Sequence, residues 1–189
     1  PYQIAATERI LLKIQYAHNR RLQGTRRAGG YIWHTTGSGK TLTSFKTAQL
    51  ASKLPEVDKV LFVVDRKDLD YQTMKEYDNF EKGCANSNTS SNILQKQLND
   101  PHDGKKIIIT TIQKLSSLLK KKKEVWCADK HVVIIFDECH RSQFGDMHVM
   151  VTKAFKKYYL FGFTGTPIST ANIATGKYAN LRTTAQAFG

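Results

Sequence analysis

The sequence predicts an α/β fold, in which helices cover both faces of a doubly wound, mainly parallel β-sheet. Five short, continuous apolar runs alternate with segments of helical spacing, the pattern of buried parallel strands joined by crossover helices. Each run also ends in a polar motif, and in open sheets of this kind ligands bind beyond the carboxyl ends of the strands. The expected strands cover residues 31–33, 60–64, 107–110, 132–136 and 159–163.

The segments between these strands predict the helices. Residues 4–16 place Ala5, Ile10, Leu11 and Ile14 near one helical face, and residues 40–50 also have helical spacing. Further helices are expected over residues 69–80, 93–98 and 144–155. Residues 19–30 form a basic, Gly-containing loop, whereas residues 83–92 are polar and turn-rich, which is typical of a surface loop.

The composition indicates one globular domain without a membrane segment. The chain has 189 residues, of which 40% are hydrophobic and 24% charged. No run reaches the roughly 18 apolar residues of a membrane span, so no membrane contact is expected. The three cysteines lack paired metal-ligand spacing, which favours a reduced, cytoplasmic setting. Because Pro1 stands where an initiator Met is expected, the chain is predicted to be a piece of a longer protein.

The charge of the chain is strongly positive and unevenly distributed. The formal net charge is +13, and residues 1–55 carry nine Lys or Arg against one acid, Glu8. Residues 56–81 reverse this balance with eight acids against four bases, and the remainder is basic again, with sixteen against seven. Such an excess favours a polyanionic partner, because neutralised phosphates release counterions. A basic protein with no nucleic-acid role is the alternative.

A Gly-rich turn between the first expected strand and its helix predicts a phosphate-binding loop. Glycines let successive backbone N–H groups point at one anion, and the helix start adds a positive dipole end. The Lys of such a loop reaches the β- and γ-phosphates, and the Thr hydroxyl holds Mg²⁺. An ordinary Gly-rich turn is the alternative, and His34 stands where the general pattern has Gly. The residues expected to bind the nucleotide are Thr36, Gly37, Ser38, Gly39, Lys40 and Thr41.

Two adjacent carboxylates follow the fourth expected strand. A buried strand holds Asp137 rigidly, so that it can bind the Mg²⁺ held by Thr41, and Glu138 can polarise the attacking water as a general base. A solvated turn is the alternative, which the G-S-G-K-T loop disfavours. His140 lacks a His or Cys partner at ligand spacing, so a coupling hydrogen bond is expected in place of metal binding. The expected catalytic residues are Glu138, Asp137 and Lys40.

These motifs resemble those of the superfamily 2 helicase-like ATPases. D-E-C-H at 137–140 resembles motif II, F-T-G-T-P at 163–167 resembles motif III, which links ATP state to DNA contacts, and D-R-K-D-L at 65–69 resembles motif Ia. T-T-I-Q-K at 110–114 is similar to a later DNA-contact motif, and P-Y-Q at 1–3 to the end of an adenine-reading motif. The resemblance implies that Gln3 reads adenine. It also implies coupling by His140, Thr164 and Thr166, and DNA contacts by Arg66, Lys67, Thr111, Gln113 and Lys114.

As a set, the motifs are similar to those of the motor (R) subunit of type I restriction enzymes, which also has His at the first phosphate-loop position. The similarity covers residues 3–189. It implies a RecA-like fold and a motor that uses ATP to pull double-stranded DNA past a methyltransferase core, with cleavage by a nuclease domain elsewhere in the subunit. Residues 1–189 are then the first RecA-like domain, and residues 168–189 lead toward the second. The implied partners are double-stranded DNA, the second RecA-like and nuclease domains, and the methyltransferase and specificity subunits.

The residues alone leave other functions open. Another superfamily 2 helicase or translocase carries similar motifs. A P-loop kinase or GTPase is disfavoured, because no N-K-x-D guanine motif is present and F-T-G-T-P has no role there. A non-catalytic DNA-binding module is disfavoured by the intact Lys40, Asp137 and Glu138. The four lysines at 120–123 favour a solvated helix end, with phosphate contact along the DNA as the alternative.

Overall fold

A computed structural model shows five parallel strands in one sheet. It describes residues 2–35, 39–65, 75, 77–79, 91–100, 106–121, 126–137, 144–167 and 184. The strand order is β1-β5-β4-β2-β3, and every neighbouring pair is parallel. This confirms the predicted α/β sheet. The strands are β1 (Gly30–Trp33), β2 (Lys59–Val64), β3 (Ile107–Thr111), β4 (His131–Asp137) and β5 (Lys157–Thr164).

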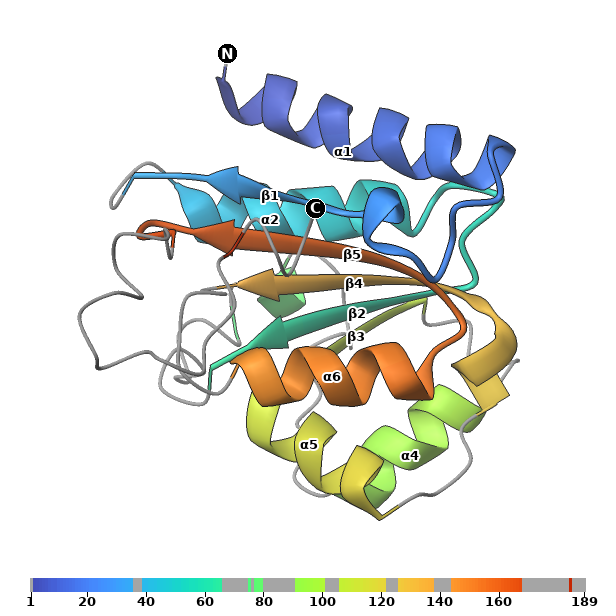
Figure 1. Cartoon of the computed structure of the whole chain (residues 1–189). Helices are drawn as coiled ribbons and strands as arrows, with labels where there is room; N and C mark the ends of the chain where they lie inside the picture. The colour runs from blue at the N-terminus through green and yellow to red at the C-terminus, as the bar shows by residue number, and fades with distance from the viewer. Residues whose placement is uncertain are drawn as a thin grey trace, which may run out of the picture.

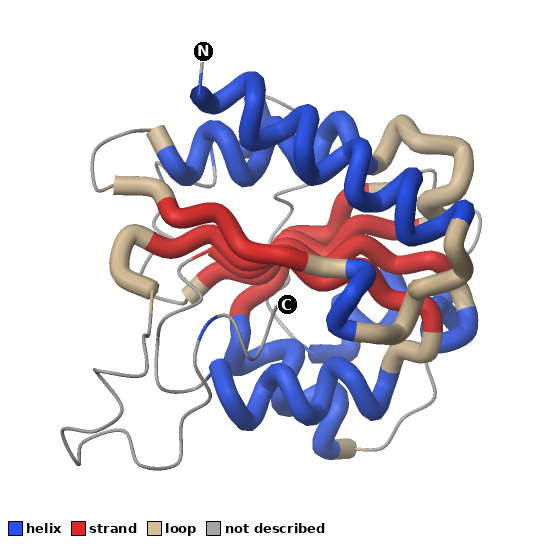
Figure 2. Tube along the Cα trace, turned by 45° about the horizontal axis from the view of Figure 1, so that its top comes forward, coloured by secondary structure: helices blue, strands red, loops and turns tan. Residues whose placement is uncertain are grey.

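Helices cover both faces of this sheet, as the sequence predicts. Figure 1 shows α1 (Tyr2–Asn19) and α2 (Lys40–Ala51) on one face, and α4 (Ser91–Asn99), α5 (Ile112–Lys120) and α6 (Phe144–Ala154) on the other. Figure 2 shows the same arrangement as a sheet layer between two helical layers. Two short 3₁₀ segments, η1 (Arg26–Ala28) and η3 (Trp126–Asp129), precede β1 and β4.

Two hydrophobic cores lie on the two faces because successive side chains of a strand point in opposite directions. Along β2, Val60 and Phe62 pack with Phe45 of α2, whereas Leu61 and Val63 pack with residues of α4, α5 and α6. All six residues of β2 are buried. Double-sided burial explains why the strands read as continuous apolar runs.

The carboxyl ends of three neighbouring strands, β1, β5 and β4, lie side by side. Asp137, the last residue of β4, pairs with Phe163 of β5, and Trp33, the last residue of β1, pairs with Thr164. The polar motifs after these strands therefore start from one edge of the sheet. Among the described residues, no helix is long and apolar enough to cross a membrane.

One helix was missing from the sequence prediction. The structure places Thr111 at the end of β3, and α5 begins at the next residue. The Thr111 hydroxyl accepts a hydrogen bond from the backbone N–H of Lys114 at 3.2 Å and so caps the helix. T-T-I-Q-K was interpreted only as a motif after a strand, but it is also a capping sequence.

Other boundaries differ by smaller amounts. Ser91 and Asn92 belong to α4, so the loop predicted over 83–92 ends earlier than expected. Lys120 ends α5 and Lys121 follows it, and both are exposed, as a solvated helix end requires. Of the helix predicted over 69–80, residues 75 and 77–79 are described and helical. The remaining residues of that prediction, and Lys122 and Lys123, lie outside the described residues.

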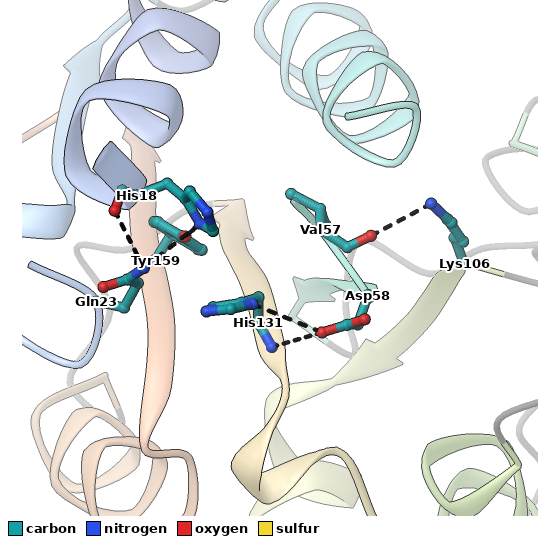
Figure 3. A network of polar contacts seen from close by, with 7 residues as sticks. All are labelled: His18, Gln23, Val57, Asp58, Lys106, His131 and Tyr159. Carbon is teal, nitrogen blue, oxygen red and sulfur yellow. Dashed lines mark hydrogen bonds and ion pairs between the residues drawn. The ribbon is translucent and has the colours of Figure 1, made fainter. Parts of the chain in front are cut away.

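Polar side chains form a network at the amino ends of the strands (Figure 3). The Asp58 carboxylate accepts a hydrogen bond from the backbone N–H of His131 at 2.8 Å, and the Asp58 N–H donates to the His131 carbonyl at 2.9 Å. The ring of His131 meets that of His18 edge-on at 5.1 Å, and His18 Nδ1 lies 3.1 Å from the Tyr159 hydroxyl. These contacts connect α1 to β4 and β5.

Candidate nucleotide-binding site

The described part of the predicted phosphate loop ends in a left-handed glycine. Gly39 has φ +75° and ψ +32°, a conformation that side chains with a Cβ rarely adopt. The next residue, Lys40, starts α2, and Thr43 closes the first turn by donating its N–H and its hydroxyl to the Gly39 carbonyl. The predicted nucleotide contacts Thr36, Gly37 and Ser38 lie outside the described residues.

The Gln3 side chain lies close to Gly39. A Cβ built at position 39 would lie 2.6 Å from Nε2 of Gln3, so a larger residue there would displace the end of this side chain. Gln3 is in the first turn of α1, so the start of this helix lies directly against the phosphate loop. The structure thus brings together two residues that the sequence predicted for the same site. That Gln3 reads adenine stays a prediction.

Lys40 and Thr41 converge on Asp137 at the end of β4. The Lys40 ammonium lies 3.6 Å from Asp137 Oδ1, and the Thr41 hydroxyl donates to Asp137 Oδ2 over 3.4 Å. Asp137 is only 3% exposed. Both contacts are longer than good hydrogen bonds.

The carboxylate and hydroxyl oxygens of Asp137 and Thr41 are of the kind that Mg²⁺ binds. Mg²⁺ prefers carboxylate and hydroxyl oxygens, and it is usually bound by one or two protein groups together with substrate phosphates. The structure brings Asp137 and Thr41, the two predicted ligands, within hydrogen-bonding range of each other. Within the described part of the chain, no group of three or more His, Cys, Asp or Glu could hold a metal ion unaided. Substrate phosphates and water would supply further oxygens.

His34 is a buried packing residue at the start of the loop. Its ring lies 5.4 Å from that of Tyr2 and 6.4 Å from that of Phe163, and its backbone N–H donates to the Thr164 carbonyl at 2.8 Å. Burial, and then the nearby Lys40 charge, lower the pKa of the imidazole below its ordinary value of 6.5. A neutral ring at this position adds no charge to compete with Lys40.

The segment after β5 is held by two hydrogen bonds. The Thr164 hydroxyl accepts from the N–H of Thr166 at 3.1 Å, so these predicted coupling residues contact each other. The Trp33 indole N–H donates to the Gly165 carbonyl at 3.1 Å, although 68% of Trp33 is exposed. Sequence reasoning missed Trp33, because its partner is 132 residues away.

The other predicted residues lie apart from this cluster or outside the described chain. Three predicted DNA-contact residues lie near another strand: Thr111 ends β3, and Gln113 and Lys114 follow it in α5. In the sheet, β2 separates β3 from β4. Thr111 is 4% exposed, and its hydroxyl caps α5. The catalytic candidate Glu138, the coupling candidate His140 and the DNA candidates Arg66 and Lys67 lie outside the described residues.

Comparison with known proteins identifies the family. The family model of the SWI2/SNF2 ATPases matches residues 2–189. The C-terminal part of the MpnIIP type I restriction enzyme endonuclease subunit of Mycoplasma pneumoniae is 51% identical over 160 residues, covering 82% of this chain and 77% of that protein. The SauCOLORF180P type I restriction enzyme endonuclease subunit of Staphylococcus aureus is 44% identical over 192 residues, covering 100% of this chain but only 19% of that protein.

Solved structures show the same fold at lower identity. The Hef helicase domain of Pyrococcus furiosus superposes with a TM-score of 0.64 at 19% identity, over 100% of this chain and 35% of that one. The SWI2/SNF2 ATPase core of Sulfolobus solfataricus, solved with double-stranded DNA, superposes with a TM-score of 0.59 at 20% identity. That comparison covers 100% of this chain and 35% of the other. The chain therefore belongs to the SWI2/SNF2 ATPases and to the endonuclease subunits of type I restriction enzymes, of which it forms a RecA-like ATPase motor domain.

Proposed function

We propose that this chain binds ATP with Mg²⁺ at the carboxyl edge of its sheet. The observation that carries the proposal is the convergence of Lys40 and Thr41, from the start of α2, on the buried carboxylate of Asp137 at the end of β4. A carboxylate with a cation at 3.6 Å and a hydroxyl at 3.4 Å matches the groups that contact a nucleotide phosphate and its metal ion.

Each residue of the site has a separate role in this proposal. Lys40 faces the β- and γ-phosphates, and the backbone of residues 36–39 surrounds them. Asp137 and Thr41 hold Mg²⁺, which neutralises charge on the phosphates. Glu138 accepts a proton from the attacking water, and Gln3 reads the adenine edge. The close approach of Gln3 to Gly39 supports a single site built from α1 and the loop.

We also propose that a whole endonuclease subunit couples this ATP hydrolysis to translocation of double-stranded DNA. The chain spans about a fifth of the staphylococcal relative, so the second RecA-like domain and the nuclease domain belong to the remainder of the subunit. Residues 168–189 lead toward that second RecA-like domain. The methyltransferase and specificity subunits complete the assembly in the cytoplasm. The net charge of +13 supports contact with a nucleic-acid backbone.

Nucleotide binding is tested by removing Lys40. Calorimetry of the Lys40→Ala variant should show no detectable binding of Mg·ATP, because the main cation facing the phosphates is lost. Lys156→Ala is the matched control: Lys156 pairs with Asp129 at 2.7 Å on the exposed surface near the start of β5. The control should bind as the parent does. Equal affinity of Lys40→Ala and parent would refute the assignment of the loop.

The DNA part is tested with Lys114→Ala in the whole endonuclease subunit. A motor steps along any sequence, so its contacts should go to phosphates. The variant should weaken all duplexes alike and reduce the log–log salt slope of binding by about 0.9, the value of one phosphate contact. If neither the slope nor translocation changes, the T-T-I-Q-K segment only caps α5 and does not contact DNA.

A further inference from the structure

A second group of cations lies along α1 and in the loop that follows it. Residues 9–27 contain six Lys or Arg and no acid. Figure 1 shows that α1 runs antiparallel to the strands, so its first turn lies near their carboxyl ends and its last turn near their amino ends. At the rise of about 1.5 Å per residue, Lys13 is roughly 15 Å along the helix from Gln3. None of the predicted nucleotide or DNA residues belongs to this cluster.

Part of the cluster lines a pocket of about 490 Å³. One side of the pocket is the last half of α1, and the other is the loop that includes η1 and leads into β1. The pocket is lined by three cationic side chains, one aromatic ring and apolar groups. The lining residues are Lys13, Tyr16, Leu22, Arg26, Arg27 and Gly29.

The fold holds this loop in place. Gly24 has φ +77°, and a Cβ there would lie 2.1 Å from the carbonyl oxygen of Lys156, so only glycine fits. The Gly24 N–H donates to the Tyr158 carbonyl at 3.0 Å, and the Leu22 N–H donates to the Ala17 carbonyl at 2.9 Å. These bonds attach the loop to β5 and to α1. The cations of η1 are therefore presented on a fixed backbone.

The pocket has cations in excess of nearby acids. Among the described residues, no carboxylate lies within ion-pair distance of Lys13 or Arg27, and Glu8 is the one acid before residue 56. The guanidinium of Arg20 stacks over the Tyr16 ring at 5.7 Å, which brings a further charge to the rim. Such a pocket attracts anions, and guanidinium groups suit phosphate because they can donate two parallel hydrogen bonds.

We propose that this pocket binds backbone phosphates of double-stranded DNA, as a contact separate from the motifs that follow the strands. The inference rests on the proposed function in so far as the subunit acts on DNA. A duplex fits better than one acidic side chain, because Arg9, Arg20 and Arg21, which lie on or just after α1, are exposed as well. A duplex backbone presents many phosphates along its length, so several exposed cations can contact it. Sequence-independent contact also suits a motor.

The test uses the whole endonuclease subunit and a short duplex. Binding is measured by fluorescence anisotropy between 50 and 200 mM salt for the parent, Arg26→Ala/Arg27→Ala and Lys46→Ala/Lys53→Ala. The first pair should reduce the log–log salt slope by roughly 1.8, since each phosphate contact contributes about 0.9. The second pair removes the same charge from residues that do not line the pocket and should keep the parent slope. Mg·ATP affinity should be unchanged in both variants.

The outcomes separate this inference from the proposed function. If Lys114→Ala flattens the slope and Arg26→Ala/Arg27→Ala does not, the pocket proposal is overturned while the motor proposal stands. If the parent binds no duplex, both fall. The Arg26→Ala/Arg27→Ala subunit could also keep the parent's salt slope of duplex binding but no longer assemble with the methyltransferase subunits. In that case the pocket binds protein and the inference is wrong.

A measurement on the parent protein covers the case in which the variant does not fold. Saturating duplex should protect Lys13 from acetylation, read by mass spectrometry, while Lys46 stays reactive. Equal labelling of Lys13 with and without the duplex would overturn the inference.

Discussion

The two ends of the sheet differ in how tightly their polar groups are paired. At the amino end, Asp58 and His131 exchange hydrogen bonds of 2.8 and 2.9 Å, although 42% of the Asp58 side chain is exposed. At the carboxyl end, Asp137 is 3% exposed, yet its contacts with Thr41 and Lys40 are 3.4 and 3.6 Å long. These two contacts at the carboxyl end are thus longer than the two at the amino end.

The partners differ in kind as well as in distance. Asp137 meets the cation and the hydroxyl of the predicted nucleotide loop, and a bound cation would add a further partner to this buried charge. The amino end already has short bonds and serves the fold. We therefore expect substitutions at the carboxyl end to change ligand binding, and substitutions at the amino end to change stability.

The largest expected effect concerns hydrolysis. We predict that the purified chain binds Mg·ATP but turns it over roughly 10³–10⁵ times more slowly than the whole subunit, because an arginine finger contributes that factor and none is expected in this chain. Steady-state phosphate release, measured on both proteins, checks this. Robust turnover by the chain alone, abolished by Glu138→Gln, would show that its carboxyl edge is a complete site.

Asp137→Asn should separate binding from stability. The charged oxygen ligand is lost, so Mg·ATP affinity should fall roughly 10–100-fold, as expected for an interaction of about 1.5–3 kcal/mol. The free energy of unfolding should change little, because asparagine keeps the side-chain shape and one oxygen acceptor. Calorimetry and urea unfolding measure the two quantities, with Asp129→Asn on the exposed surface as the control. A large stability loss with unchanged affinity would reverse the roles of the two ends.

Asp58→Ala should have the opposite effect. Removing the acceptor for the His131 N–H should lower the free energy of unfolding by about 1 kcal/mol, or the melting temperature by about 2–4 °C. Mg·ATP affinity should stay at the parent value. Asp58→Asn keeps an acceptor oxygen and should retain most of the stability. A nucleotide-binding defect in Asp58→Ala would mean that the two ends are coupled.

The smallest expected effect is on pH dependence. Burial lowers the pKa of His131 below its ordinary value of 6.5, and the charges of His18, Lys157 and Lys130 add to this, while Asp58 opposes it. The unfolded chain therefore takes up the proton first, so stability is present above pH 6.5 and falls as the pH decreases below it.

Melting temperatures from pH 7.5 to 5.5 test this expectation. The melting temperature of His131→Gln should decrease less than that of the parent as the pH falls. A smaller decrease should remain in the variant, because the pKa of His34 is also lowered. An identical pH dependence in variant and parent would show that His131 does not contribute.

The five strands and most of the helices could be predicted from the amino-acid sequence. These features depend on local physics: an apolar run forms a buried strand, and a left-handed position such as Gly39 favours glycine. Helix α5 differs, because the sequence around its capping residue Thr111 also resembles a DNA-contact motif, which predicts no helix.

Contacts between residues far apart in the sequence depend on the three-dimensional fold. The side chain of Gln3 lies close to Gly39. Hydrogen bonds join Trp33 to Gly165 and Asp58 to His131. In each case the two residues are far apart in the sequence. The strand order and the antiparallel course of α1 set these contacts, and no local periodicity encodes them. The basic pocket also depends on the fold. The sequence shows that the segment is rich in cations, but the hydrogen bond from Gly24 to β5 holds the loop in the position that forms the pocket.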